Sequence, residues 1–561
     1  AQEANAIKRG GRVMVMLGNP PYNVASSNRS EWIQGLVADY KRNLGEQTIN
    51  SLSDDYIKFI RLGQHYIERN GQGIVAYVCN NRFLNGEVFR RMREELTQAF
   101  DTIYIVNLHG STKIKELAPG GGKDENVFGI MLGVCICIMV KSNTRREGLA
   151  HVYYHDLWGR KLEKFEALGH LCLDDLQRQE ISYEPPSYYL TPKDFGYREE
   201  YERGVQMESI FLLKGKSGIR TDRDQICVCS TADEAAQLAN DAITLSAEAF
   251  KQKYRVVQEG RNWSVARAQA DVRENADTQQ IAEYAYRPFD RKFVVYTGRT
   301  NGILAWPGSH SFDCLLSGSN FALDVSKGLS SEEFHHVFCC SMLPDTGMLS
   351  GNTSETGRLF PLYISRNTGK NFFDSGDALV PNLQPEAVER FEAIAGRKIA
   401  PEELFDYIYA VLHTLGYRQR YREFLKVNFP RIPLPRDGAH FSALAEKGGK
   451  LRRLHLLQDA DGWVLEATYP AAGSNAVEAV RWEDERVYIN AQQHFGHVPR
   501  EVWEFYIGGY QPAQKWLKDR KGKALDYEGI ERYRRIVHAL DGTIRIMEEL
   551  EGLWEETLAL K

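Results

Sequence analysis

The sequence lacks the features of membrane and secreted proteins. No apolar run among its 561 residues reaches the ~18 residues that a membrane span needs. The longest, from Val127 to Val140, contains two glycines and is more typical of a buried strand hairpin. Residues 1–8 do not follow the charged-then-apolar order of a secretory signal. These absences predict a cytoplasmic protein with no membrane partner.

Cysteine is sparse. The chain has nine cysteines, an odd number that does not suggest a disulfide framework, and no C-x-x-C pair. Two C-x-C pairs, Cys135/Cys137 and Cys227/Cys229, fall in strand-like segments. Small buried side chains explain these pairs more simply than a zinc site does. The sequence therefore predicts a reducing compartment and no metal.

An excess of positive charge is also lacking. The formal net charge is −5, whereas proteins that bind nucleic acid are usually basic. One stretch differs, because residues 418–453 contain ten Lys or Arg against three Asp or Glu, with aromatic residues between them. Such a stretch suits a phosphate backbone, and a solvated helix face followed by a loop is the alternative. The candidate DNA-binding residues are Arg418, Arg420, Arg422, Lys426 and Arg431.

What the sequence does contain, over residues 1–145, is an alternation of strand-like and helix-like segments. This alternation predicts an α/β fold with a largely parallel sheet. Apolar runs and helical spacing set the expected elements. The expected strands lie at 13–17, 74–78, 103–108, 127–130 and 134–140, and the expected helices at 56–67 and 87–100.

The proline-containing segment 184–208 interrupts this alternation. It is predicted to be a linker between a first domain at 1–183 and a second at 209–561. The second domain is predicted to be mixed α+β and helix-rich from about residue 386. Strands are expected near Phe293 and Tyr363, and helices at 386–395, 402–415 and 527–550.

The tetrapeptide Asn19-Pro20-Pro21-Tyr22 directly follows the first expected strand. In this position it resembles the catalytic motif of amino-directed methyltransferases that use S-adenosylmethionine. The resemblance implies that the side-chain oxygen of Asn19 and the carbonyl of Pro20 each accept a hydrogen bond from adenine N6. These bonds localise the nitrogen lone pair for attack on the methyl group, and the prolines hold the carbonyl in place. Asn19 would also border the cofactor. An ordinary strand-to-loop turn is the alternative.

The same resemblance implies base flipping. An adenine inside a duplex cannot reach such a pocket, so it must be extruded, at a cost of a few kcal/mol. Stacking on aromatic side chains returns roughly 1–3 kcal/mol per base. Tyr22 would stack on one face of the adenine. Phe128, in the segment Asn126-Val127-Phe128 that resembles a further family motif, would stack on the other, and a core position is its alternative.

Two more segments match this family in the expected order. Residues 54–59 resemble the helix whose aromatic residue packs on the cofactor adenine, which assigns that role to Phe59; a core position is the alternative. Residues 73–84 resemble the next strand and the loop at its carboxyl end, where ligands of open α/β sheets bind. Asn80 and Asn81 are therefore pocket-lining candidates, and a plain strand-end turn is their alternative.

The C-terminal part resembles the specificity region of single-chain restriction enzymes, the type ISP group first and the type IIG group next. The resemblance covers nearly the whole chain. Its segments are Gly218–Asp224, Tyr286–Asp290, Tyr421–Arg431 and Trp516–Lys521. Arg287 and Asp290 are either a structural ion pair or DNA readers, and we favour the structural interpretation.

One motif of this family is missing. Its members bind the cofactor with a Gly-rich turn that should precede Asn19, and only 18 residues do so. Neither 119–122 nor 506–510 has the required pattern. We therefore expect an incomplete Rossmann-like methyltransferase sheet, with its N-terminal strands absent and the catalytic strand at an open edge. No G-x-x-x-x-G-K-[ST] motif occurs, so the nuclease and the ATP-driven helicase of the type ISP group would lie upstream in a longer polypeptide.

The resemblance thus implies an adenine-N6 DNA methyltransferase and DNA-recognition portion of a restriction-modification enzyme. It would act on double-stranded DNA with S-adenosylmethionine, and would be inactive as this fragment. The first alternative is a DNA-binding specificity module whose catalytic half is inert. A weaker alternative is a protein-glutamine or RNA methyltransferase, since these enzymes use the same tetrapeptide. They do not usually carry a C-terminal domain of this length.

Overall fold

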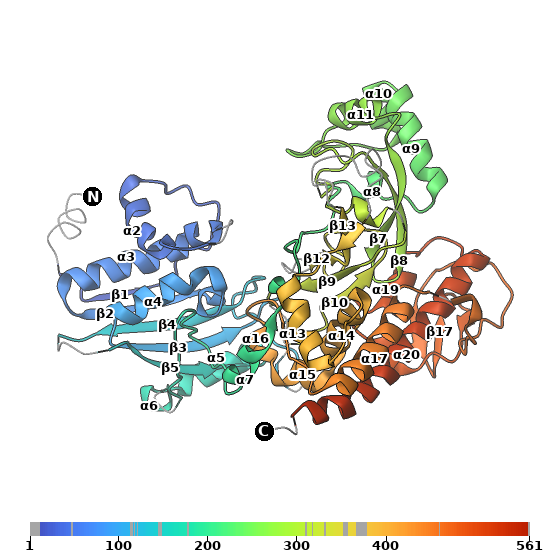
Figure 1. Cartoon of the computed structure of the whole chain (residues 1–561). Helices are drawn as coiled ribbons and strands as arrows, with labels where there is room; N and C mark the ends of the chain where they lie inside the picture. Colours follow the sequence, from blue (N-terminus) through green and yellow to red (C-terminus); the bar gives the residue numbers. More distant parts are fainter. Residues whose placement is uncertain are drawn as a thin grey trace. The chain divides into compact units, whose positions relative to one another are not determined.

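The structure is a computed structural model. It describes residues 12–558, apart from 46–48, 113–115, 117, 120–121, 144–147, 177–178, 309–310, 317, 330–332, 352–356, 366–378 and 459. The chain forms two compact units, Ala1–Phe195 and Gly196–Lys561, which run from blue to teal and from green to red in Figure 1. No helix of the described residues is both long and apolar enough to cross a membrane.

The first unit is built on a five-stranded sheet in the order β1-β2-β4-β3-β5. The β1–β2 and β3–β5 pairs are parallel, and β4 is antiparallel to both of its neighbours. The strands are β1 (Val15–Gly18), β2 (Gly73–Asn80), β3 (Thr102–His109), β4 (Val134–Lys141) and β5 (His151–Asp156). The helices are α2 (Glu31–Lys41), α3 (Asp55–Asn70), α4 (Arg90–Ala99), α5 (Lys161–His170) and α6 (Leu173–Leu176), with short turns η1 (Asn50–Ser53), η2 (Asn81–Leu84) and η3 (Glu87–Phe89).

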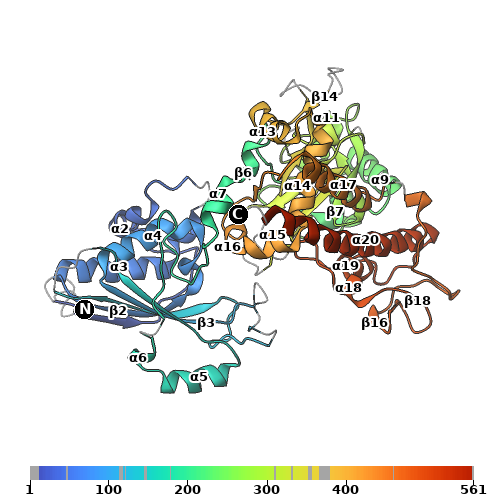
Figure 2. The same ribbon diagram turned by 60° about the horizontal axis from the view of Figure 1, so that its bottom comes forward.

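Both faces of this sheet are buried. Successive side chains of a strand point to opposite faces, so a strand that is buried on both contributes to two apolar clusters. In β3, Ile103 and Ile105 belong to one apolar cluster, and Tyr104 and Val106 belong to another. Helices α2, α3 and α4 cover one face, and α5 and α6 lie on the other (Figures 1 and 2). The Cys135/Cys137 pair is fully buried on the face of α3 and α4, as expected of small apolar side chains.

Helix α3 runs three residues past the end of the expected helix at 56–67 and ends at Asn70. Gly71 adopts the left-handed conformation at φ 82°, and its N–H donates to the carbonyls of Ile67 and Glu68. Glycine takes this conformation without steric cost, so it closes the helix just before β2 begins.

The expected strand at 127–130 is not formed. These residues make a turn in which Gly129 has a φ of 70°, and β4 alone fills the space between β2 and β3. The prediction of a paired hairpin is therefore wrong. The side-chain oxygen of Asn126 accepts hydrogen bonds from the N–H groups of Phe128 and Ile130, which takes the place of strand pairing.

The segment 184–208 is packed rather than free. In the first unit, the carbonyl of Ser187 accepts a hydrogen bond of 2.8 Å from the buried Arg93, and Leu190 is fully buried. From Arg198 the chain forms α7 (Arg198–Arg203) and β6 (Val205–Gln206), and β6 pairs with a strand of the second unit. The boundary between the units, after residue 195, lies within this segment.

The second unit combines several small sheets with long helices. β9 lies between β10 and β12, and β7 lies between β11 and β8. Its strands are β7 (Gln280–Arg287), β8 (Asp290–Tyr296), β9 (Ala322–Ser326), β10 (Val337–Cys340), β11 (Leu343–Pro344), β12 (Gly357–Pro361), β13 (Tyr363–Ser365), β14 (Leu379–Pro381), β15 (Arg431–Ile432), β16 (Arg481–Glu483), β17 (Arg486–Tyr488) and β18 (His494–Phe495).

Helices α14, α17 and α20 pack together in the C-terminal half of this unit (Figure 2). The helices are α8 (Asp224–Cys227), α9 (Ala232–Thr244), α10 (Ala247–Lys253), α11 (Val265–Glu274), α13 (Pro385–Ala395), α14 (Pro401–His413), α15 (Leu415–Arg420), α16 (Arg422–Leu425), α17 (Gly438–His455), α18 (Arg500–Glu504), α19 (Pro512–Lys518) and α20 (Tyr527–Leu558), with short turns η4 (Met207–Ser209), η5 (Asp313–Leu315) and η6 (Ala460–Gly462).

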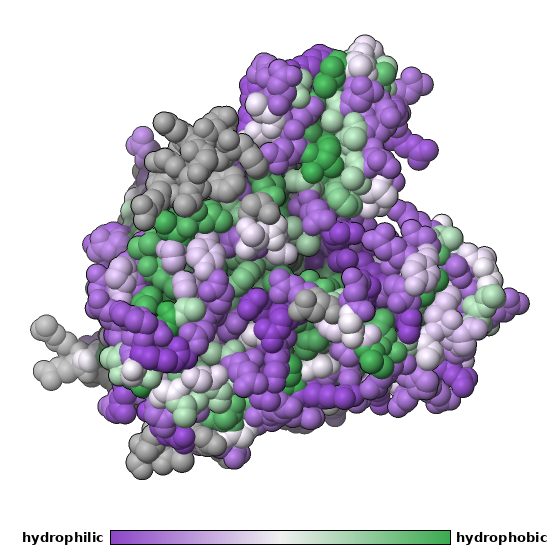
Figure 3. Space-filling view, turned by 45° about the vertical axis from the view of Figure 1, so that its right-hand side comes forward, coloured by the Kyte–Doolittle hydropathy of each residue, from purple (hydrophilic) through white to green (hydrophobic). Residues whose placement is uncertain are grey.

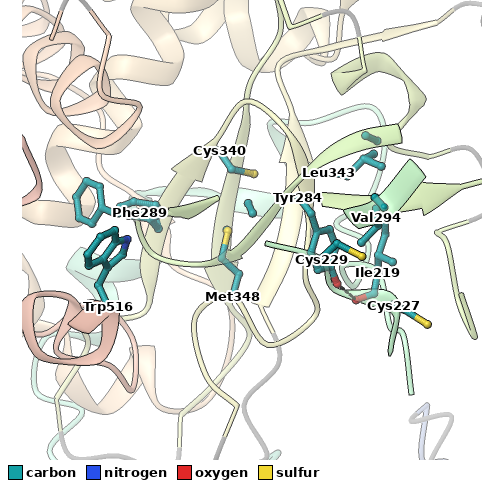
Figure 4. Packing of buried hydrophobic residues seen from close by; sticks show 14 of the residues in the cluster. Ile219, Cys227, Cys229, Tyr284, Phe289, Val294, Cys340, Leu343, Met348 and Trp516 are labelled. Atoms are coloured by element: carbon teal, nitrogen blue, oxygen red, sulfur yellow. Dashed lines mark hydrogen bonds between the residues drawn. The ribbon is translucent and has the colours of Figure 1, made fainter. Parts of the chain in front are cut away.

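One large core joins strands β7 to β12 to helices α8 to α11 and α18 to α20. It contains Tyr284 and Val294 of the β7–β8 hairpin together with Met348 and Trp516, which are far apart in sequence (Figure 4). The second C-x-C pair, Cys227/Cys229, is buried in this core. The chain is therefore α/β in its first unit and mixed α+β in its second, with helices toward the C-terminus. The outer surface seen in Figure 3 is mainly hydrophilic, with smaller apolar areas between.

Candidate active site

The loop that carries Asn19 to Tyr22 leaves the end of β1 and is fastened to helix α3. The carboxylate of Asp54 accepts a hydrogen bond of 2.8 Å from the N–H of Asn23. The buried amine of Lys58 donates to the hydroxyl of Ser26 and to the carbonyl of Asn28, at 2.5 and 2.6 Å. Burial raises the pKa of Asp54, and backbone N–H groups, with that of Asn23 first, partly offset the rise. Sequence reasoning missed these two anchors, although both lie in the segment 54–59 that it singled out.

Asn19 presents its amide to solvent. It is exposed, whereas Pro20 is buried. The side-chain oxygen of Asn19 accepts one hydrogen bond of 3.2 Å, from the hydroxyl of Tyr22, and an amide oxygen has a second lone pair. Within the described part of the chain, no donor binds the carbonyl oxygen of Pro20. Two acceptors thus remain available side by side at the end of β1.

Tyr22 is half-buried and firmly placed. Its hydroxyl also donates to the carbonyl of Val78 in β2, at 3.1 Å, and its ring meets the edge of Tyr56 at a centroid distance of 6.0 Å. Desolvation by burial raises the pKa of Tyr22, so its hydroxyl remains a donor. The ring packs against the apolar cluster that contains Val127, which brings the loop after β1 and the turn at 126–132 to one part of the unit.

Phe128 is 44% exposed at the tip of this turn. Val127 beside it is buried, and Asn126 organises the turn, since its amide also donates to the carbonyl of Leu132 at 2.6 Å. An exposed phenylalanine on a well-bonded turn is available to stack on a ligand. The face-to-face placement of Phe128 and Tyr22 across a base remains a prediction.

The three remaining site candidates differ in whether their side chains are free to contact a ligand. Phe59 is 40% exposed, although its neighbours Lys58 and Ile60 in α3 are buried. Asn80 is buried and its side chain accepts a hydrogen bond from the N–H of Arg82, which caps η2. Asn81 donates to the side-chain oxygen of Asn107 at 3.0 Å. Phe59 is therefore open to a ligand, whereas the two asparagines already shape the carboxyl end of β2.

The carboxyl end of β3 holds a charged cluster that sequence reasoning did not identify. His109 is buried, with one ring nitrogen 2.6 Å from Asp156 and the other 2.8 Å from Glu116. Its ring stacks on Trp158 at a centroid distance of 3.3 Å. Burial alone would lower the pKa of His109, but hydrogen bonds to Asp156 and Glu116 raise it overall. Only the fold reveals this cluster, because its members are separated in sequence.

The basic stretch after residue 418 is largely internal, so its prediction as a DNA-binding surface needs correction. Arg418 is buried and donates to the carbonyl of Leu412, and burial lowers its pKa to about 10. Arg420 forms a forked pair with Glu200, at 2.9 and 2.8 Å.

The other members of this stretch are also engaged. Arg431 donates to the carbonyls of Glu202 and Gly204, and Lys426 pairs with Glu423 at 3.1 Å. Of the five candidate residues, Arg422 has the most open side chain, 54% exposed, and it lies 3.4 Å from Glu423. The charge of these candidates therefore serves mainly internal contacts. The carboxylate partner of Arg420, Glu200 on α7, is distant in sequence and could not be identified from the stretch itself.

The specificity-region segments are tied to one another by ion pairs. Arg287 pairs with Asp345 at 2.8 Å, and Asp290 pairs with Arg520 at 2.9 Å. Arg287 and Asp290 thus form structural ion pairs, but with Asp345 and Arg520, so the expected pair between the two residues is not formed. The Asp290–Arg520 pair joins two of the family segments, and the hydroxyl of Tyr286 reaches Asp224 in a third, at 2.9 Å.

A different basic surface lies on the extended segment 211–220. Backbone bridges link it to β12 at Lys216 and to Trp306 at Arg220. Its alternate residues face solvent, so that Lys214 and Lys216 are exposed. Among the described residues, no carboxylate lies within ion-pair distance of either amine. Trp306 is 49% exposed beside Arg220.

Comparisons with known proteins match both units. Residues 210–549 match the family described as the type ISP C-terminal specificity domain, and residues 3–114 match the Eco57I restriction-modification methylase family. A type II methyltransferase of Geobacillus stearothermophilus, M.BstVI, is 33% identical over 96 residues, which are 17% of this chain and 15% of that protein.

Solved structures share the fold. The ATP-dependent type ISP restriction-modification enzyme LlaBIII bound to DNA matches 98% of this chain at 18% identity, with a TM-score of 0.76. A DrdV–DNA complex matches 98% at 22% identity, with a TM-score of 0.75. The type ISP enzyme LlaGI with a DNA substrate mimic matches 98% at 18% identity, with a TM-score of 0.72. The chain spans 38%, 58% and 54% of these three proteins.

Proposed function

Because the chain belongs to the family of type ISP C-terminal specificity domains, we propose that it is the methyl-transfer and DNA-recognition part of a restriction-modification enzyme. The proposed reaction moves a methyl group from S-adenosylmethionine to N6 of an adenine flipped out of double-stranded DNA. Two neighbouring acceptors carry this proposal: the exposed amide oxygen of Asn19, and the carbonyl of Pro20, to which no described donor binds. Both lie in the loop that contains Tyr22.

The chemistry follows from those acceptors. One N6 hydrogen binds the side-chain oxygen of Asn19 and the other binds the carbonyl of Pro20, which localises the lone pair on nitrogen. S-adenosylmethionine, when bound, supplies the methyl group on a positively charged sulfur. The nitrogen would form its bond to that methyl group as the S–C bond broke, and it would then lose one proton to water. The two acceptors act because they are already placed where positive charge develops on the amine.

The residues present fit this cofactor at one position. Phe59 offers an exposed ring on the helix that also anchors the catalytic loop, and such a ring can pack on the cofactor adenine. The Gly-rich turn that would hold the rest of the cofactor has no counterpart in the sequence. We therefore propose that the chain works within a longer polypeptide, which supplies the missing lobe and carries nuclease and helicase domains upstream.

An exposed apolar edge supports this view and also favours a second candidate function. β1 lies at the end of the sheet, with Val15 52% and Leu17 74% exposed. Without a covering lobe, the chain alone would recognise DNA and transfer no methyl group. For DNA recognition, we propose that the exposed Lys214, Lys216 and Trp306 contact the duplex, in place of the internal basic stretch.

Asn19→Ala in the full-length polypeptide tests the proposed reaction. Loss of one preorganised partner of the reacting group should lower kcat by roughly 100- to 1,000-fold. Asn19 is exposed and takes only one long hydrogen bond, so the free energy of unfolding should change little. The measurement is transfer of radiolabelled methyl to cognate duplex, with DNA affinity followed in parallel. A near-normal rate in the variant would refute the assignment.

A further inference from the structure

Helix α5 is anchored by a lysine with no exposed surface. The side chains of Lys164 and Asp124 are both 0% exposed, and their charged atoms are 2.7 Å apart. The same amine donates to the carbonyls of Leu108 and Glu125, at 2.7 and 2.8 Å. An ammonium group has three donors, and all three are used. Burying a charge this completely is costly unless its partners are well placed.

The two carbonyls bound by Lys164 belong to different segments. Leu108 is near the end of β3, and Glu125 directly precedes Asn126. Lys164 therefore ties the start of the turn that carries Phe128 to the carboxyl end of the sheet.

The turn at 126–132 is held by its own hydrogen bonds and packs closely against Gly110. Asn126 bonds to the N–H groups of Phe128 and Ile130 and to the carbonyl of Leu132, at 2.9, 3.2 and 2.6 Å. Gly110 lies so close that an added side chain would meet the Cα of Asn126 at 2.5 Å. Because the turn is rigid, it can move only as a whole, and the bond from Lys164 to the carbonyl of Glu125 opposes that movement.

Contacts that do not involve Lys164 also hold the carboxyl end of β3 in place. His109, next to Leu108, is held between Asp156 and Glu116 and stacks on Trp158. The strand end is therefore a fixed platform, and Lys164 connects the turn to it.

We propose that Lys164 is a positioning residue, which sets the place of Phe128 against the flipped base through the carbonyls of Leu108 and Glu125. This role rests on the proposed function. Its physical basis is that a displacement of about 1 Å in a reacting geometry lowers rates by up to roughly 100-fold.

The test separates the ion pair from the two carbonyl contacts. Lys164→Met alone leaves a buried, uncompensated carboxylate and destabilises the fold. The informative variant is therefore Asp124→Asn with Lys164→Met, which removes both charges. Its comparator is Asp124→Asn alone, in which the buried ammonium loses its counter-charge but keeps the carbonyls of Leu108 and Glu125 as acceptors, so the melting temperature of each variant is measured first. Asparagine retains the acceptor that the N–H of Gly159 uses at 2.9 Å. Lys123→Met serves as a surface control, since Lys123 pairs with the Glu125 side chain while 74% exposed.

In the full-length polypeptide, the double variant should lose roughly 10- to 100-fold in kcat relative to Asp124→Asn, with DNA affinity within about twofold. The loss should shrink to less than about twofold when both proteins also carry Phe128→Ala, because Lys164 acts through Phe128. Assays are run below the melting temperature of the least stable variant.

Two results would overturn the role of Lys164. One is a kcat loss on removing Lys164 that is the same with and without Phe128→Ala, and the other is an equal kcat for the double variant and for Asp124→Asn. Failure of the proposed function gives a different pattern. In that case Asn19→Ala retains normal methyl transfer, whatever Lys164 does.

Discussion

Replacing Lys214 and Lys216 together by glutamine tests where the second unit meets DNA. Both amines are exposed, and neither has a carboxylate partner among the described residues. Each can therefore neutralise at most one phosphate. Since each neutralised phosphate adds about 0.9 to the slope of log affinity against log salt, the double variant should flatten that slope by up to about 1.8.

This change is large enough to measure. Between 50 and 200 mM salt, a slope change of about 1.8 alters the ratio of the two affinities by about 12-fold. The assay is fluorescence anisotropy of the 561-residue chain with a labelled duplex. Affinity for unrelated sequences should fall by the same factor as affinity for the cognate site, because phosphate contacts carry no direct sequence information.

A matched control has the same change of charge. Lys398 and Lys450 are exposed, but each already pairs with a glutamate at 2.7 Å. Their double replacement by glutamine should leave the slope within experimental error. An unchanged slope for the Lys214/Lys216 variant would show that the segment 211–220 does not face phosphates. Arg420→Gln would then test the basic stretch after residue 418. Because Arg420 pairs with Glu200, we expect this variant to lower stability and to leave the slope unchanged.

Two further predictions concern the first unit. His109 has a raised pKa in the folded chain, so its stabilising contribution is complete below the unfolded-state pKa of about 6.5 and is lost as pH rises through the folded-state pKa. Thermal unfolding should show this decline, and a decline of equal size in His109→Gln would contradict it. Phe128→Ala should lower methyl transfer by roughly 5- to 150-fold through lost stacking, with little change in melting temperature because the ring is 44% exposed; an unchanged rate would remove Phe128 from the site.

Local signals were sufficient for much of the fold. The alternating segments of residues 1–145 predicted β2, β3, α3 and α4, because side-chain periodicity reflects burial on one face or both. The motifs also predicted the family, and the match over residues 210–549 confirms it. The exposure of Asn19 and the burial of Pro20 agree with a turn that presents one amide and fixes one carbonyl, though their catalytic roles stay predictions.

The prediction of a strand at 127–130 is wrong for a physical reason. Residues 127–130 have the apolar composition of a strand, but the side chain of Asn126 satisfies their N–H groups locally and a turn results. Sequence composition cannot show that outcome, because strand pairing and local bonding compete for the same backbone donors.

The sequence by itself determined the family and the order of the main elements, and it singled out the tetrapeptide Asn19–Tyr22, since these depend on residues close together in the chain. Only the tertiary structure decided which charges remain free. Arg418 is buried and Arg420 is paired with Glu200, whereas Lys214 and Lys216 stay in solvent. Likewise, only folding brings Lys164 to Asp124 and to the ends of two other segments. Charge pairing is a property of distance in space, and distance along the sequence does not determine it.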